Sequence, residues 1–217
     1  MTAELPKFQF YGRRKGKPLR RTHVGLMETL LPQVAVDLAA PLNRALAHCW
    51  LEIGFGGGEH LAHQASLNPG VTMLGAEPYL NGVAKILAEI EARKLSNVRV
   101  HHGDARLLLQ SLPDQCFERV YLLYPDPWPK PRQQKRRFIN TENLVQIHRV
   151  LKPLGQFWFA SDIEDYVHWT RQHVAANSGF AEDGDALQPF ENWTRTRYEA
   201  KAVREGRASA YLHFRKT

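Results

Sequence analysis

The sequence predicts an α/β domain in which a mostly parallel sheet carries helices on both faces. From about residue 48 onward, short apolar runs alternate with helical patterns, and this alternation is typical of parallel sheets. A glycine-rich turn follows the first apolar run and leads directly into a helical pattern, as in nucleotide-binding α/β folds. With 217 residues, 43% of them hydrophobic, the chain can bury one complete core.

The expected elements follow from apolar periodicity. Strands are predicted at residues 48–53, 71–76, 98–102, 119–123, 156–161, weakly after 179, and at 208–214. Helices are predicted at residues 59–67, 79–94, 105–112, 140–151, 163–177 and 195–204. Residues 26–46 predict a helical segment broken by Pro41, and residues 1–25 predict an irregular or mobile basic arm. We therefore expect that arm and a single domain over residues 26–217.

The positive charge is concentrated in two clusters. Within a formal net charge of +7, residues 1–27 hold seven cations against one acid, and residues 130–137 hold five cations and no acid. Clustered cations favour a polyanionic partner, because they release counterions from a phosphate backbone. The alternative for each cluster is a solvated surface.

Compartment and redox state are predicted from what the chain contains. Cys49 and Cys116 lie in apolar surroundings without metal-ligand spacing, so we expect reduced core thiols. No apolar run approaches the roughly 20 residues of a membrane span, and no signal peptide is evident. A soluble intracellular protein is expected. The pairs His60/His63 and His101/His102 lack further spaced ligands, so no metal site is predicted.

The glycine turn is unsuited to a dinucleotide. A G-x-G-x-x-G motif that begins at Gly54 and continues at Gly56 would need a third glycine where this chain has Glu59. The nearby acid Glu52 would also repel phosphate. A nicotinamide-dependent dehydrogenase is therefore disfavoured.

Acids at successive strand ends predict a different ligand. Glu77 and the Asp104–Ala105 pair follow the second and third predicted strands, and Glu52 lies at the first. An acid after the second strand binds ribose hydroxyls in doubly wound folds. A ribose-containing ligand without phosphates is expected, and S-adenosyl-L-methionine fits this description. Each acid alone is also typical of a helix N-cap or turn.

The segment Tyr124–Lys130, YPDPWPK, alternates prolines with chemically distinct side chains. Each proline disfavours helical backbone in the residue before it, so an extended, pre-organised recognition strip is expected. Asp126 within it is either a ligand contact or a turn carboxylate that caps backbone amides. Trp128 is expected either to stack on a base or to pack.

Seven motifs occur in an order that resembles the bacterial tRNA (guanine-N7)-methyltransferases. They are EIGFG from Glu52, AEP from Ala76, GDA from Gly103, PDPWPK from Pro125, KRRF from Lys135, SD from Ser161 and TRYE from Thr196. The resemblance implies a Rossmann-like class I methyltransferase fold with seven strands and S-adenosyl-L-methionine as donor. It also implies a guanine in the tRNA variable loop (position 46) as acceptor, and a cytoplasmic location. No obligate protein partner is implied, and a monomer or homodimer is expected.

The resemblance also assigns roles to residues of this chain. Catalysis falls to Asp126. Cofactor binding falls to Glu52, Gly54, Gly56, Glu77, Asp104, Ala105 and Asp126. Substrate binding falls to Lys130, Asp162, Thr196, Arg197, Tyr198 and Glu199. From the charge clusters we expect RNA phosphate contacts at Arg13, Arg14, Lys135, Arg136 and Arg137.

Alternatives remain at this stage. Thr196 and Glu199 have the spacing of a helix capping box. A methyltransferase acting on another RNA, a protein or a small molecule would share the cofactor half. A non-catalytic RNA-binding protein would share the basic clusters.

Overall fold

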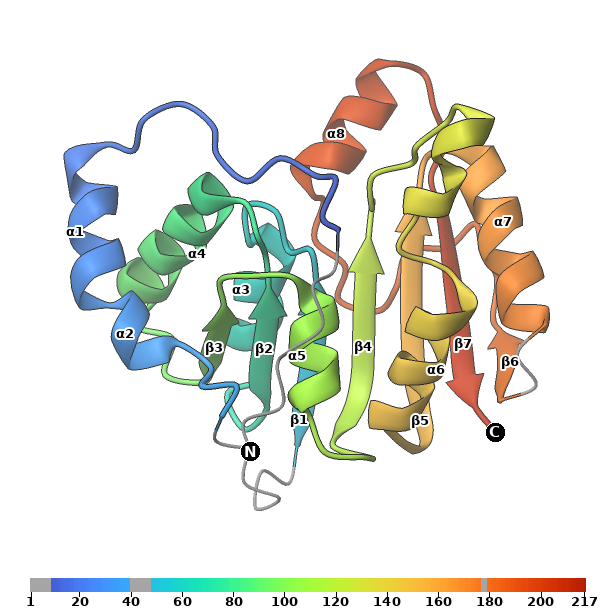
Figure 1. Cartoon of the computed structure of the whole chain (residues 1–217), viewed down its shortest axis with the longest axis horizontal. Coiled ribbons are helices and arrows are strands. Elements are labelled where there is room, and N and C mark those ends of the chain that lie inside the picture. The colour runs from blue at the N-terminus through green and yellow to red at the C-terminus, as the bar shows by residue number, and fades with distance from the viewer. Residues whose placement is uncertain (1–8, 40–47, 177–178) are drawn as a thin grey trace.

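Seven strands form one sheet in the order β3-β2-β1-β4-β5-β7-β6 (Figure 1). The computed structural model describes residues 9–39, 48–176 and 179–217. The strands are β1 Cys49–Ile53, β2 Thr72–Ala76, β3 Val98–His101, β4 Phe117–Leu123, β5 Leu151–Ser161, β6 Phe180–Asp183 and β7 Ala210–Lys216. Pairs from β3 through β5 are parallel, whereas β7 runs antiparallel to β5 and β6. The predicted mostly parallel sheet is confirmed.

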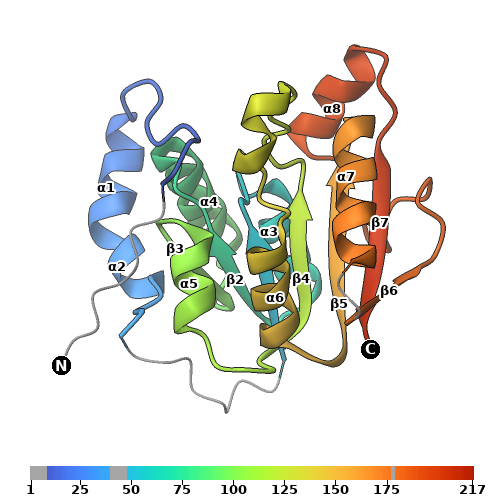
Figure 2. The ribbon, with the colours of Figure 1, turned by 45° about the vertical axis from the view of Figure 1, so that its right-hand side comes forward.

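Helices cover both faces of this sheet. They are α1 Arg21–Thr29, α2 Leu31–Val34, α3 Glu59–Leu67, α4 Leu80–Arg93, α5 Ala105–Ser111, α6 Thr141–Val150, α7 Glu164–Ala175, α8 Arg197–Arg204, and a 3₁₀ helix, η1, Pro131–Arg136. Figures 1 and 2 show α5, α6 and α7 over one face and α3 and α4 over the other, with α1 packed outside α4. Both η1 and α8 lie beyond the carboxyl ends of the parallel strands.

The core has two layers because side chains alternate along each strand. Leu51 and Ile53 point to the face covered by α5, α6 and α7. Trp50 points to the opposite face, where it joins side chains from α3 and α4. Strands β1, β2, β4 and β5 contribute buried apolar side chains to both layers, which explains their nearly continuous apolar runs. Strand β3 contributes only Val98 and Val100, both to the layer under α3 and α4.

The helical segment predicted over residues 26–46 ends with α2 at Val34, and Ala35 forms an isolated bridge with Val100. Two other predicted boundaries are also wrong. Helix α1 begins at Arg21 rather than Leu26, inside the segment expected to be irregular. Arg20 makes no side-chain capping bond, so the sequence carries no start signal there. Strand β5 begins at Leu151 rather than Gln156. Its backbone is irregular near the start, where Leu154 has a positive φ of 61°. The predicted break at Pro41 lies outside the described residues.

Both cysteines are free thiols. Burial raises the pKa of Cys49 to about 11 and that of Cys116 to about 12, which makes both thiols poor nucleophiles. Among the described residues, no helix combines the length and apolarity needed to cross a bilayer.

Candidate active site

A cavity of about 540 Å³ opens at the carboxyl ends of the parallel strands, where open α/β sheets bind ligands. Its lining includes residues 9–13, Gly54 and Gly56 of the glycine turn, Glu77, Asp104, Ala105, Asp126 and Trp128, Lys135 and Arg136 of η1, and Arg197 and Tyr198 of α8. The structure therefore brings together most of the predicted cofactor residues and only part of the predicted RNA-binding set.

The glycine turn and Glu77 form one unit. Gly54 and Gly56 have φ values of 70° and 58°, a region that glycine adopts without strain. The Gly56 N–H donates to Glu77 Oε2 at 2.7 Å and the Tyr79 N–H donates to Oε1 at 2.9 Å. Burial raises the pKa of Glu77, although these bonds and the nearby Arg197 cation oppose the rise. Two backbone donors thus fix a carboxylate in the cavity wall.

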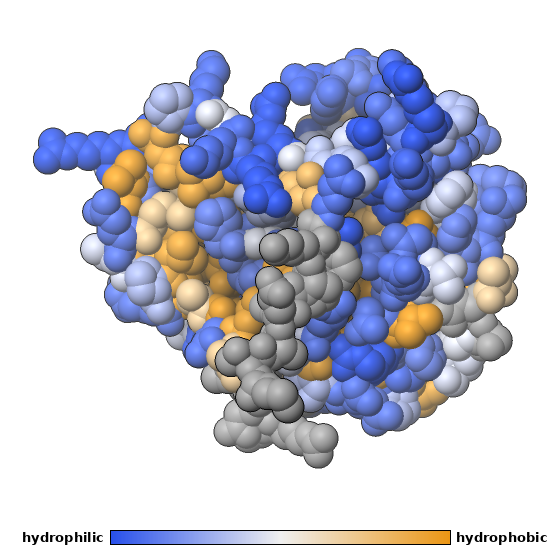
Figure 3. Space-filling model, in the orientation of Figure 1, coloured by the Kyte–Doolittle hydropathy of each residue, from blue (hydrophilic) through white to orange (hydrophobic). Residues whose placement is uncertain are grey.

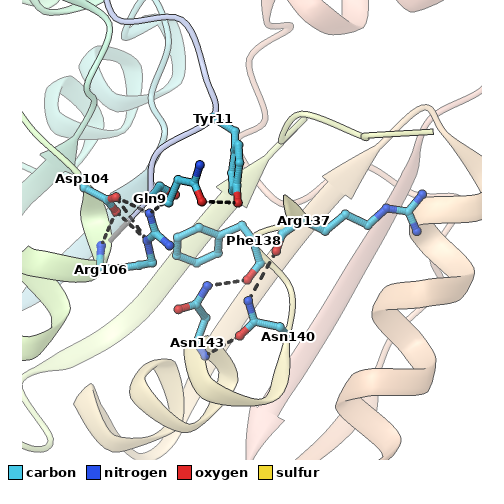
Figure 4. A network of polar contacts seen from close by, with 8 residues as sticks. All are labelled: Gln9, Tyr11, Asp104, Arg106, Arg137, Phe138, Asn140 and Asn143. Carbon is cyan, nitrogen blue, oxygen red and sulfur yellow. Dashed lines mark hydrogen bonds and ion pairs between the residues drawn. The ribbon is translucent and has the colours of Figure 1, made fainter. Parts of the chain in front are cut away.

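Asp104 caps helix α5 and also faces the cavity. Its Oδ1 accepts from the Arg106 backbone N–H at 2.9 Å, so the N-cap alternative is confirmed. The Arg106 guanidinium pairs with the same carboxylate at 2.5 Å and donates to the Gln9 carbonyl at 3.2 Å. Figure 4 shows this chain of contacts from Asp104 through Arg106 to the arm. The arm is therefore tied to the wall of the cavity that Asp104 lines.

Glu52 does not line the cavity. It precedes the last residue of β1 and is only 3% exposed, with His60 Nδ1 2.7 Å from its Oε2. The His60 ring lies against Tyr121 and Trp193, at 4.8 and 5.4 Å between centroids. The expectation that Glu52 contacts the cofactor is therefore at odds with this geometry. Strand alternation sends its carboxylate into the core under the glycine turn.

The strip, Tyr124–Lys130, departs from the predicted extended backbone at two residues. Tyr124 and Trp128 have φ values of 50° and 43°, so the prediction is wrong for both. Such backbone costs on the order of 1–3 kcal/mol and persists where surrounding contacts enforce it. The Tyr124 N–H donates to the Ala160 carbonyl at 2.7 Å and its hydroxyl to Ser209 Oγ at 2.8 Å. These bonds hold the start of the strip.

Asp126 lies in the cavity wall on this strip. Burial raises the pKa of its carboxyl group. Its charge also contributes to the raised pKa of Glu77, and both carboxylates line the same pocket. Such a pocket attracts a cation.

Contacts between η1, the strip and the arm form the outer wall of the cavity. The Arg136 guanidinium lies 4.5 Å from the Tyr11 ring centroid and 4.9 Å from that of Trp128. The two rings meet edge to face at 6.2 Å. Trp128 therefore packs against Tyr11 and Arg136, which agrees with packing, one of the two alternatives predicted for it. Hydrophilic residues cover the molecule over η1 and α8 (Figure 3).

Arg137 does not face solvent. The residue is 1% exposed, and its guanidinium pairs with Asp165 and donates to the Pro127 carbonyl at 2.8 Å. It also lies over the rings of Tyr166 and Trp169. In Figure 4 its side chain points away from Asp104 and Arg106, toward α7. This geometry is at odds with the predicted phosphate contact at Arg137, because the guanidinium anchors the strip.

Three further predicted residues lie outside the cavity lining. Lys130 is exposed. Asp162 follows β5 and accepts from Arg207 Nε at 2.7 Å. The Arg14 carbonyl accepts from the Leu80 N–H at 2.9 Å, which docks the arm on α4. Its guanidinium lies over the Phe10 ring at 5.3 Å.

The TRYE segment begins helix α8. Thr196 caps the helix, with Oγ1 accepting from the Glu199 N–H at 3.2 Å. The Glu199 carboxylate does not return to the cap, as a full capping box requires. Instead it accepts from Trp193 Nε1 and from the Tyr211 hydroxyl, both at 2.7 Å. Arg197 and Tyr198 reach the cavity, whereas Thr196 and Glu199 are buried beside it.

Some cavity residues escaped the sequence reasoning. Tyr11, Arg106, Phe138 and Asn143 all line it. Asn143 Nδ2 donates to the Phe138 carbonyl at 2.7 Å, which shapes the turn between η1 and α6 (Figure 4). Only Arg106 carried a local signal, since it follows Asp104 by two residues.

Comparison with known proteins decides the family. Residues 47–212 match the family described as "Putative methyltransferase". The chain is 50% identical over 217 residues to the tRNA (guanine-N(7)-)-methyltransferase of Agrobacterium fabrum, with 94% of each protein covered. The chain belongs to the tRNA (guanine-N7)-methyltransferase family. It is also 48% identical to the family member of Ruegeria pomeroyi over 233 residues, covering 99% of this chain and 97% of the relative.

Solved structures agree with this family at the level of the fold. A structure titled "Structure of an Antibiotic Related Methyltransferase" has a TM-score of 0.57 at 17% identity, covering 83% of this chain and 94% of that one. A 30S ribosomal A1408 methyltransferase from an uncultured bacterium has a TM-score of 0.54 at 14% identity, covering 80% and 89%. The predicted class I methyltransferase fold is confirmed for this family member.

Proposed function

We propose that this chain transfers a methyl group from S-adenosyl-L-methionine to N7 of a guanine in tRNA, in the variable loop at position 46. The single observation that carries this proposal is the cavity in which Glu77 and Asp126 stand together at the rim of the sheet. Membership of the tRNA (guanine-N7)-methyltransferase family supports the same reaction. A tRNA substrate supports a cytoplasmic location.

The cavity suits the donor. Its volume of about 540 Å³ lies in the usual range for small-ligand sites, about 300–1,000 Å³. Glu77 would hold the ribose hydroxyls, Gly54 and Gly56 would allow close backbone approach, and Asp104 with Ala105 would hold the adenine. When bound, the donor supplies a methyl group carried on a sulfonium.

Asp126 would orient the acceptor base. Guanine N7 has a free lone pair and no proton at neutral pH, so its methylation needs no general base. A carboxylate accepts from guanine N1 and N2, a donor pair that adenine lacks. Orientation of two reactants can lower a barrier by several kcal/mol. The Asp126 charge would also offset the positive charge that develops on the purine.

The outer surface would hold the tRNA backbone. Lys130 and Lys135 are exposed on the strip and on η1, and Arg13 lies at the cavity mouth. Exposed cations near a cavity bind phosphate through counterion release. Arg14 and Arg136 remain proposed phosphate contacts at the edge of this surface. Asp162 remains a proposed substrate contact, separate from the phosphates.

Incubation with methyl-labelled donor and mixed tRNA tests the proposal. We expect label in tRNA that maps to alkali-labile 7-methylguanine at the variable loop, and none with Asp126→Ala. Binding of tRNA without label would indicate a non-catalytic RNA-binding protein. Label found only in another RNA or in a small molecule would overturn the assigned acceptor.

A further inference from the structure

Arg197 brings a positive charge to the glycine turn. It is the first residue of α8 and lines the cavity. A Cβ placed on Gly56 would lie 3.2 Å from Arg197 Nη2 and 3.2 Å from Tyr198 Cε2. The guanidinium therefore lies against the turn itself, from which the Gly56 N–H donates to Glu77.

Buried contacts fix this position. The Glu199 carboxylate accepts two hydrogen bonds of 2.7 Å, from Trp193 and Tyr211, and Thr196 caps the same helical turn. Glu199 is 7% exposed, so its oxygens are occupied and shielded. The first turn of α8 is thus anchored from beneath, and Arg197 is directed over the glycine turn.

The Arg197 guanidinium retains unused donors. Nη2 donates to the Tyr198 hydroxyl at 3.2 Å, while Nε is buried without a hydrogen-bond partner among the described residues. A buried, unpaired donor on a charged group is costly, so a ligand that accepts from it gains affinity. Guanidinium groups bind carboxylates through paired hydrogen bonds.

We propose that Arg197 binds the carboxylate of the donor's amino-acid moiety, and is therefore a cofactor residue rather than a tRNA contact. This inference rests on the proposed function. The same pocket holds the acids Glu77 and Asp126, which suit the ribose hydroxyls and the cationic parts of the donor. Its other cations lie elsewhere: Arg106 pairs with Asp104, Arg136 lies over Tyr11 and Trp128, Arg137 pairs with Asp165, and Arg13 and Lys135 are exposed. The donor has one carboxylate, which a cation would bind. Arg197 lies against the glycine turn, next to Glu77, the acid proposed to bind the ribose.

Calorimetry with two ligands tests this assignment. S-adenosylhomocysteine carries the carboxylate, and its decarboxylated analogue lacks it. We expect Arg197→Gln to weaken S-adenosylhomocysteine binding by about 10–100-fold, the range for a charged hydrogen bond, and to leave binding of the analogue unchanged. Arg197→Lys should lose less, because it keeps the charge. Arg195→Gln, at an exposed neighbouring cation outside the cavity lining, is the matched control and should bind both ligands normally.

The outcomes separate the two proposals. Equal losses for both ligands, or no loss for either, would overturn the role of Arg197. A wild-type protein that binds neither ligand would overturn the proposed function itself. Melting temperatures of the variants establish that each one is folded.

Discussion

The inner and outer walls of the cavity are built by different means. The inner wall consists of the glycine turn, Glu77, Asp104 and Asp126, each beginning within three residues of the end of a parallel strand. The outer wall joins Tyr11, Trp128 and Arg136, which lie far apart in the chain and meet through ring and cation contacts. The sheet topology thus fixes the proposed donor side, whereas side-chain packing between loops forms the proposed acceptor side.

The largest effect should come from Asp126, where the two walls meet. With saturating donor, we expect Asp126→Asn to lower kcat about 10²–10³-fold, the usual cost of removing a charge that stabilises a transition state. Single-turnover kinetics with tRNA would measure it. Near-normal turnover would reduce Asp126 to a turn carboxylate.

Arg137 should affect stability rather than RNA binding. Arg137→Ala removes a buried guanidinium from between Tyr166 and Trp169 and leaves the Pro127 carbonyl without its donor. We expect the free energy of unfolding to fall by about 2–4 kcal/mol, as measured by urea denaturation. The salt dependence of tRNA binding should stay unchanged. A variant with normal stability and a reduced salt slope would restore the phosphate contact.

Lys135 should show the opposite behaviour. It is exposed beside the cavity mouth, so Lys135→Ala should raise KM for tRNA and reduce the slope of log K against log salt by about 1. Donor affinity should not change. Lys85→Ala, at an exposed cation on α4, changes the net charge equally and should leave the slope intact. Equal effects of both substitutions would assign η1 to a solvated surface.

The smallest effect concerns pH and the inner wall. Burial raises the pKa of both Glu77 and Asp126, and only the deprotonated carboxylates attract a cationic donor. Donor affinity should be highest at neutral pH, where both groups are deprotonated, and should fall as the pH drops through their raised pKa values, at a higher pH than carboxylates with ordinary pKa values would give. Calorimetry across a pH series measures this. The Glu77→Gln/Asp126→Asn double variant should give a flatter profile.

The sequence predicted the position of a cavity residue correctly where that residue closely follows the end of a strand. Glu77 and Asp104 follow strand ends, so apolar runs and parallel topology placed them in the cavity. The expectation that Glu52 faces the cavity does not match the structure, because Glu52 lies within β1, where strand alternation directs its side chain into the core. The burial of Arg137 was not predicted, because no local feature of the sequence distinguishes it from the exposed Lys135. Its burial depends on Asp165, Tyr166 and Trp169 of α7.

Backbone conformation in the strip was equally beyond local rules. The prolines predicted extended backbone, but Tyr124 and Trp128 have positive φ. Hydrogen bonds from Tyr124 to Ala160 and Ser209 enforce the first, and Trp128 packs between the arm and η1. These partners come from distant segments, which no local propensity describes.

Donor binding by two acid variants tests the inner wall most directly. By calorimetry, Glu77→Gln should weaken S-adenosyl-L-methionine binding by about 10–100-fold. Glu52→Gln should keep the affinity for S-adenosyl-L-methionine and lower the melting temperature, because the Glu52 carboxylate is buried against His60. Wild-type affinity in Glu77→Gln, or an equal loss in a folded Glu52→Gln, would contradict the account.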